Sequence, residues 1–151
     1  MIAKIQQFDL SKPVYVESES SRIGNLQLPS RLWKKMVESP MVIIKTPVTE
    51  RANYLLGVYD HLSKEKIDII KLINGMQHRH GKKITQKWQG LFDAEDWVEL
   101  AKALLTDHYD PAYDNSVGRH ERKVYKTIIQ KNCRPHTISK TADIILNLQS
   151  N

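Results

Sequence analysis

The chain has 151 residues, of which 40% are apolar and 26% are charged, a composition typical of a soluble globular domain with one hydrophobic core. Its single cysteine, Cys133, excludes an internal disulfide and a cysteine-based zinc site and fits a reducing cytoplasm. No apolar stretch approaches the length of a membrane span, so we expect a cytoplasmic protein without a membrane partner. The net charge of +6 weakly favours a polyanionic partner such as RNA.

A short β-branched run that ends in polar residues is the first informative stretch. Val14-Tyr15-Val16 predicts a buried strand, and the acids and serines after it predict the loop at its carboxyl end. Ligands of open parallel α/β sheets bind at the carboxyl ends of strands. Glu17, Glu19 and Arg22 therefore either face a phosphate or metal site or belong to a solvated connection with capping serines. Spacing alone does not decide between these two interpretations.

The next segments predict a helix and a second strand. Pro29-Ser30 indicates a helix start with Ser30 as N-cap, and Pro40 ends the helix. Its predicted apolar face consists of Leu32, Trp33, Met36 and Val37. Met41–Ile44 predicts a strand buried on both faces and parallel to the first. The predicted fold class is α/β, with Glu17 and Thr46 at the same edge of the sheet.

Thr46-Pro47 predicts the start of another helix, which carries Arg51 near the carboxyl end of the second strand. Arg51 is therefore a second candidate anion ligand, although spacing slightly favours an exposed helical arginine. The predicted core-facing residues of this helix are Val48, Ala52, Leu55, Leu56 and Tyr59.

Residues 61–107 predict three further helices that form a helical insertion or lid. Ser63 is expected to cap the first of them and Asp93 the third. Their apolar stripes predict a core and not a cofactor site. His78 and His80 lie two residues apart and so on different sides of a helix, which favours a basic helix terminus over a metal-binding pair.

The segment 108–116 combines tyrosines with turn-forming residues. Asp110-Pro111 and Asp114-Asn115-Ser116 predict turns in which the aspartates cap backbone N–H groups, an interpretation that we prefer to a metal site. The basic cluster that follows is expected to meet a phosphate backbone and consists of Arg119, Arg122, Lys123 and Lys126. Val124–Ile129 predicts a third strand, and a closing helix is expected from Ser139 with Ala142, Ile145 and Leu146 facing the core.

Three blocks of the sequence carry a family resemblance. The first runs Pro13-Val14-Tyr15-Val16-Glu17-Ser18-Glu19-Ser20-x-Arg22-Ile23-Gly24 and continues to Leu28-Pro29. The second is Pro47-x-x-x-Arg51, and the third is His108-Tyr109-Asp110-Pro111-Ala112-Tyr113-Asp114-x-Ser116. In this order they resemble the tRNA 2-selenouridine synthase family. Members of that family carry a rhodanese-like domain with a catalytic cysteine, followed by a P-loop domain.

The resemblance implies that residues 1–151 form one domain, the carboxyl-terminal part of the P-loop domain, with three strands of its parallel sheet. The chain departs from the family because it contains no G-x-x-x-x-G-K-[ST] phosphate-binding loop and no rhodanese-type active-site loop. Cys133 does not match the family's nucleophile, and we expect a passive thiol. Either the chain is a fragment or a separate upstream chain supplies the missing half.

The resemblance also implies a function. Family members convert wobble 2-thiouridine of tRNA to 2-selenouridine with selenophosphate, and can form a geranylated intermediate from geranyl diphosphate. Glu17 would stand at the Walker B position and contact a Mg²⁺-bound water, with Glu19 as the alternate acid. Arg22 and Arg51 would stabilise phosphate charge. No catalytic residue is assigned and no cofactor is firmly implied, although a diphosphate donor would be expected to bring Mg²⁺ with it.

The resemblance places Tyr109, Asp110 and Tyr113 at the substrate. The two tyrosines either stack on a base or an isoprenoid, or brace a rigid turn. Two other functions stay open at this point: a tRNA-binding module that serves a separate catalytic chain, and a fragment of another P-loop kinase or ATPase. The three matching blocks argue against the last of these.

Overall fold

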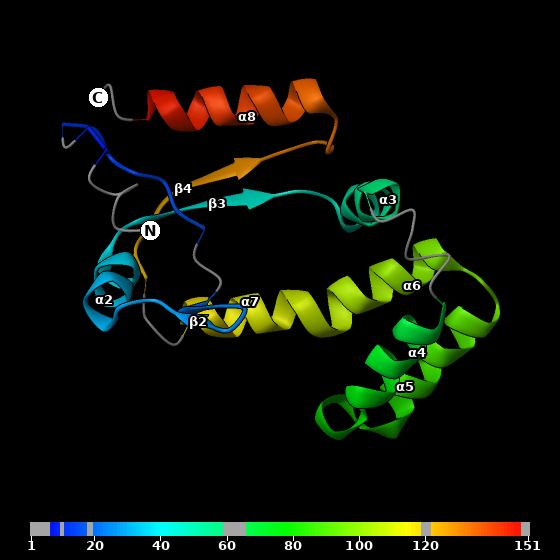
Figure 1. Ribbon diagram of the computed structural model, residues 1–151. Helices are drawn as coiled ribbons and strands as arrows, with labels where there is room; N and C mark the ends of the chain where they lie inside the picture. Colours follow the sequence, from blue (N-terminus) through cyan, green and yellow to red (C-terminus); the bar gives the residue numbers. More distant parts are fainter. Residues whose placement is uncertain (1–6, 10, 18–19, 59–65, 119–121, 149–151) are drawn as a thin grey trace.

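The computed structural model describes residues 7–9, 11–17, 20–58, 66–118 and 122–148. Its strands are Arg22–Ile23 (β1), Leu26–Gln27 (β2), Met41–Lys45 (β3) and Val124–Ile129 (β4). Its α-helices are Ser30–Glu38 (α2), Val48–Val58 (α3), Lys66–Gly75 (α4), Gln77–Asp93 (α5), Trp97–Leu104 (α6), Asp110–Gly118 (α7) and Pro135–Asn147 (α8). One π-helical turn, Leu105–Tyr109 (η2), joins α6 to α7. The mixed α/β arrangement confirms the predicted fold class (Figure 1).

Two small sheets form among the described residues. β3 and β4 are parallel neighbours, with Ile43 opposite Thr127, while β1 and β2 form a separate antiparallel hairpin. The strands predicted at 41–44 and 124–129 are therefore confirmed. The strand predicted at Val14-Tyr15-Val16 is wrong, because these described residues belong to no strand. The described residues accordingly form two two-stranded sheets and not the predicted three-stranded one.

The segment 14–16 lies outside both sheets and contacts α8 through one side chain. Val14, Tyr15 and Val16 are 45–55% exposed, so burial does not fix them. The Tyr15 hydroxyl donates a hydrogen bond to the Ile145 carbonyl at 2.9 Å. A β-branched run specifies extension, whereas a strand also needs a partner for its backbone groups. Without that ladder, the predicted placement of Glu17 beside Thr46 lacks its basis.

The β3–β4 sheet is also less buried than the sequence predicts. Ile44 is 48% exposed and Ile129 is 72% exposed, whereas Ile128 is buried. The prediction that Met41–Ile44 is buried on both faces is therefore wrong at Ile44. One helix, α8, runs beside the two strands (Figure 1), and the Tyr125 hydroxyl reaches its end by donating to the Leu148 carbonyl at 3.2 Å. A two-stranded sheet beside one helix leaves apolar surface open to solvent.

Several helix starts differ from their predicted positions. The N-cap of α2 is Pro29 and not Ser30, and no side chain caps this helix. Asp96, not Asp93, caps α6, since its carboxylate accepts from the Glu99 N–H at 3.2 Å. α8 begins at Pro135 and not at Ser139, because proline at the first helical position loses no hydrogen bond. Of its predicted core residues, Ala142 and Leu146 are exposed and Ile145 is partly buried, while Thr141 is buried instead.

The helical region that follows α3 has a core of its own. Ile73, Trp88, Leu100 and Ala103 form a buried cluster from α4, α5 and α6, which confirms most of the apolar stripes of this region as core, whereas Leu72 of the predicted stripe is exposed. The predicted apolar faces of α2 and α3 are likewise partly or fully buried wherever they are described. The predicted cap Ser63 and the core residue Tyr59 lie outside the described residues. Among the described residues, no helix is long and apolar enough to cross a membrane.

The segment 108–116 is helical, so the predicted turns are wrong. η2 covers residues up to Tyr109, and α7 begins at Asp110. Pro111 is the second residue of α7, which continues η2 without a break, and the π-type hydrogen bond from the Asp110 N–H to the Leu105 carbonyl lies directly before this residue without an N–H group. The helix therefore passes through Asp110-Pro111, where a turn was predicted.

Gly81 gives α5 a measurable weak point. Its φ of 77° and ψ of 165° break the helix between its first turn and the remainder. We expect Gly81→Ala to lower the free energy of unfolding by about 1–3 kcal/mol, because side chains strain this backbone conformation. Gly90→Ala is the matched control: Gly90 lies in the same helix with open space around it, and alanine there should raise stability by about 0.5–1 kcal/mol. Urea unfolding measures both, and equal stabilisation by the two would contradict the strained geometry.

Candidate anion-binding site

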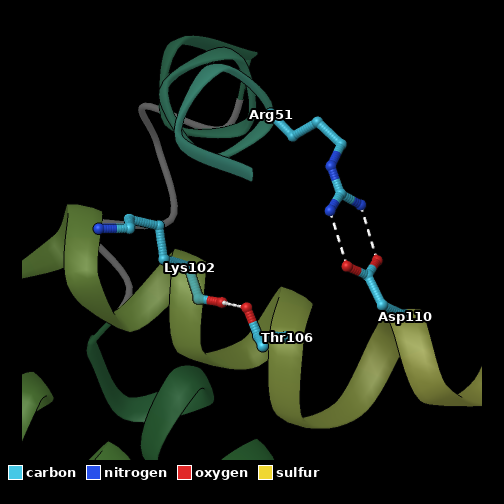
Figure 2. A network of polar contacts seen from close by, with 4 residues as sticks. All are labelled: Arg51, Lys102, Thr106 and Asp110. Carbon is cyan, nitrogen blue, oxygen red and sulfur yellow. Dashed lines mark hydrogen bonds and ion pairs between the residues drawn. The ribbon is translucent and has the colours of Figure 1, made fainter. Parts of the chain in front are cut away.

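Two of the three sequence blocks meet in one ion pair. Arg51 on α3 reaches Asp110, the first residue of α7, as Figure 2 shows. Arg51 Nη1 lies 2.7 Å from Asp110 Oδ1, and Nη2 lies 2.7 Å from Oδ2. α3 packs against α6 and η2, which brings the two side chains together across 59 residues of sequence. A bidentate pair fixes the plane of the guanidinium as well as its position.

The pair is half-buried and electrostatically stable. The side chains of Arg51 and Asp110 are 31% and 40% exposed. The hydrogen bond from Arg51 to Asp110 raises the pKa of Arg51, and burial only partly opposes it. Arg51 Nε is buried and has no hydrogen-bond partner among the described residues. Since a guanidinium carries five N–H donors, Arg51 keeps donors beyond the two that Asp110 occupies.

The carboxyl ends of β3 and β4 lie close to the start of α3. The buried side chain of Gln130, which follows β4, donates from Nε2 to the Thr46 hydroxyl at 3.3 Å, and its N–H donates to the Lys45 carbonyl at 2.8 Å. Cys133, three residues further on, also lies near enough to raise the pKa of Arg51. The predicted position of Arg51 near the carboxyl end of the second strand therefore agrees with the structure.

A second cluster of side chains connects α5 to His108, the first residue of the third sequence block, and to Asp107 before it. His80 Nε2 and His108 Nδ1 are 2.7 Å apart, and the His80 ring lies edge-on to Trp88 with a centroid distance of 5.1 Å. Trp88 Nε1 donates to Asp107 Oδ2 at 3.2 Å. No local spacing in the sequence indicates this cluster, because its partners lie up to 28 residues apart. A π-helical turn such as η2 is frequent at functional sites.

His108 makes stability depend on pH. Burial lowers the pKa of His108 below its ordinary value of 6.5, and the charges of His80 and Arg79 lower it further. The unfolded chain therefore binds a proton at a higher pH than the folded chain does. We expect the free energy of unfolding to fall as pH drops from 7.5 through 6.5 toward 5.5. His108→Gln should flatten this dependence in thermal unfolding, and His78→Gln, at an exposed position of α5, should leave it as steep as in the wild type.

The other predicted site residues do not converge on the ion pair. Arg22 is exposed on β1, and its guanidinium has no hydrogen bond or ion pair among the described residues. Glu17 is exposed, and Glu19 lies outside the described residues. Tyr109 and Tyr113 are 45% and 44% exposed, so neither is a buried strut. Tyr109 instead lies edge-on to His108, with ring centroids 4.9 Å apart.

The predicted RNA-binding cluster divides into different environments. Arg122 Nη2 donates to the Met36 carbonyl at 2.9 Å, so this arginine ties the start of β4 to α2. Lys123 and Lys126 are exposed, and Arg119 lies outside the described residues. In the part of the chain that the structure describes, no three His, Cys, Asp or Glu side chains gather in a way that could hold a metal ion.

The preoriented, half-buried guanidinium of Arg51 makes this α/β chain a candidate for anion binding. The family model described as the tRNA 2-selenouridine synthase AAA domain matches residues 1–89, which is more than half of the chain. The chain therefore belongs to the tRNA 2-selenouridine synthase family, as its three sequence blocks indicate.

Similar curated proteins carry the name tRNA 2-selenouridine synthase. The protein of Marinobacter nauticus is 28% identical, over 74% of this chain and 38% of its own length. That of Shewanella sediminis is 25% identical, over 75% of this chain and 38% of its own length. That of Aeromonas salmonicida is 30% identical, over 61% of this chain and 19% of its own length. The chain thus spans well under half of these relatives, and no solved structure gives a significant match.

Proposed function

We propose that this chain provides part of the substrate site of a transferase that converts wobble 2-thiouridine of tRNA to 2-selenouridine. Family membership supports this proposal. The observation that carries it is the bidentate contact between Arg51 and Asp110, because it joins two of the blocks that resemble the family. Selenophosphate and geranyl diphosphate, the proposed donors, both present phosphate oxygens, which an arginine fork binds well.

In this proposal Asp110 positions Arg51 and Arg51 binds the phosphate. Asp110 uses two N–H groups of the guanidinium and holds its plane fixed. The remaining donors can then meet phosphate oxygens with little loss of side-chain entropy. A preoriented cation stabilises the negative charge that grows on a departing phosphate. Arg51 therefore acts on the donor, while Tyr109 and Tyr113 present exposed rings that suit stacking on a base or an isoprenoid.

The remaining roles rest on the family resemblance. We propose that Glu17, with Glu19 as the alternate acid, and Arg22 lie at the rim of a phosphate site completed outside these 151 residues. No reaction step is assigned to Mg²⁺, because the described residues offer Glu17 no set of carboxylate or histidine co-ligands. A third strand of a P-loop-type sheet, the phosphate-binding loop and the rhodanese cysteine would also come from the rest of the protein or from an upstream chain. Residues 61–107 would be a helical insertion in a single domain, 1–151, of a cytoplasmic enzyme.

A second candidate function is tRNA binding without catalysis, for a separate catalytic chain. The basic balance of 23 to 17 charges and the exposed Lys123 and Lys126 favour it, together with Arg119 and the part of Arg122 that its Met36 contact leaves accessible. The family match argues against a fragment of an unrelated kinase or ATPase.

A reconstituted reaction tests the proposal. The intact protein, as its gene encodes it, is incubated with selenophosphate, geranyl diphosphate and tRNA bearing wobble 2-thiouridine, and the digested nucleosides are measured by mass spectrometry. We expect 2-selenouridine to appear with wild-type protein. Tight tRNA binding without any 2-selenouridine would instead support the non-catalytic module.

A further inference from the structure

The first half of α5 is a run of positive charge. Residues 77–92 contain no acidic residue. Arg79, Lys82 and Lys83 are exposed, and none of the three has an ion-pair partner among the described residues. Three other helical lysines do have ion-pair partners, Lys34 with Glu38, Lys87 with Asp107 and Lys102 with Glu99, whereas Lys35 and Lys140 have none among the described residues.

This arrangement has an internal electrostatic cost. Arg79, Lys82 and Lys83 stand within five residues of one another, and residues 77–92 contain no acidic residue that could offset their charge. Arg79 lies before the break at Gly81 and the two lysines lie after it, so their repulsion comes from proximity in the chain and not from the spacing of one continuous helix. No described contact offsets the repulsion, so the charges suit a partner outside the chain.

The run lies next to the proposed substrate site. His80, between Arg79 and Gly81, contacts His108 at 2.7 Å. His108 is two residues before Asp110, which holds Arg51. The charge of Arg79 is also close enough to lower the pKa of His108. The break at Gly81 thus separates a residue that is fixed to the site from Lys82 and Lys83, which face solvent.

We infer that Arg79, Lys82 and Lys83, named here the α5 basic surface, bind the phosphate backbone of tRNA beside the nucleotide that reaches the Arg51–Asp110 site. This inference rests on the proposed function. A nucleic acid is favoured over an anionic membrane because the exposed neighbours on this stretch are polar: Gln77, His78 and Gln86. A membrane-bound helix needs exposed apolar residues that enter the bilayer.

Salt-dependent binding tests the surface. The intact protein is titrated into fluorescently labelled tRNA bearing 2-thiouridine, at 50–300 mM KCl, as wild type and as Arg79→Gln/Lys82→Gln/Lys83→Gln. Each lost phosphate contact should reduce the slope of log K against log [salt] by about 1. We therefore expect the triple variant to lose about 2–3 of slope and to bind at least about 10-fold more weakly at 150 mM. Single variants such as Lys83→Gln should each reduce the slope of log K against log [salt] by up to about 1. They replace the triple variant in this test if it does not fold.

A matched control removes the same charge elsewhere. Arg31→Gln/Lys34→Gln/Lys35→Gln changes three exposed residues of α2 and should alter the affinity by less than about 2-fold, since it removes no phosphate contact. If the control variant loses as much tRNA affinity as the α5 triple variant, the α5 basic surface is overturned. It is also overturned if the α5 triple variant keeps its tRNA affinity and loses binding to phosphatidylglycerol vesicles. If Lys123→Gln/Lys126→Gln reduces the tRNA affinity and the α5 triple variant does not, the α5 basic surface is overturned and the proposed function stands. A wild-type protein that binds no tRNA would overturn both.

Discussion

Arg51→Met will reduce wobble selenation by the intact protein at least about 100-fold, the usual effect of removing a preorganised donor to developing charge. Methionine keeps much of the apolar stem of the side chain and removes both the charge and the fork that meets Asp110. The rate is measured as 2-selenouridine formed per enzyme at saturating tRNA, with far-ultraviolet circular dichroism to show that the fold persists.

Two further variants separate binding from structure. Arg51→Lys keeps the charge but cannot form the two-pronged contact, so its rate should also fall steeply. Asp110→Asn keeps the shape of the partner and should lower the rate less than Arg51→Met, since the arginine still reaches phosphate. A double-mutant cycle on unfolding should give a coupling of about 1 kcal/mol between the two side chains, which are partly exposed. Wild-type turnover in Arg51→Met, with reduced stability alone, would show that the pair is only structural.

Trp88→Ala will lower the free energy of unfolding by about 3–5 kcal/mol. The Trp88 side chain is fully buried at the centre of the cluster formed by α4, α5 and α6. Its N–H also donates to Asp107, so alanine creates a cavity and removes a hydrogen bond from a carboxylate. Because Trp88 also contacts His80, the α5 basic surface should lose its fixed position beside the site.

Urea unfolding with two comparison variants checks this prediction. Trp88→Phe removes the N–H but keeps most of the apolar volume, so we expect a smaller loss of about 1–2 kcal/mol. Val98→Ala, at a residue of α6 that is 36% exposed, should change stability by no more than about 0.5 kcal/mol. A loss below 1 kcal/mol in Trp88→Ala would mean that this cluster does not hold the helices together.

Apolar and β-branched patterns in the sequence correctly predicted two strands and most of the helical core. Met41–Ile44 and Val124–Ile129 are β-branched runs that form β3 and β4, and the apolar stripes at helical spacing form the cluster around Trp88. Val14-Tyr15-Val16 has the same pattern but forms no strand, because a strand also requires a neighbour to pair with. The Asp110-Pro111 pair misled for another reason, since the π-helical turn η2 lets the helix continue through it into α7 where a turn was expected.

The site was predicted residue by residue but not as a unit. Arg51 and Asp110 were each candidates for phosphate or substrate binding, yet no spacing in the sequence links residues 59 positions apart. Their contact depends on how α3 packs against α6 and η2, which is set by tertiary structure. The same limit explains why His80 was assigned to a basic helix terminus and its contact with His108 was missed.

The most direct test is the nucleoside content of tRNA in living cells. A strain without its own 2-selenouridine synthase is supplied with selenite and with the intact gene, as wild type or as Arg51→Met. We predict 2-selenouridine at the wobble position with the wild-type gene, and only 2-thiouridine or its geranylated form with Arg51→Met. Normal 2-selenouridine with Arg51→Met, or none with the wild type, would contradict the assignment of this chain to the selenation site.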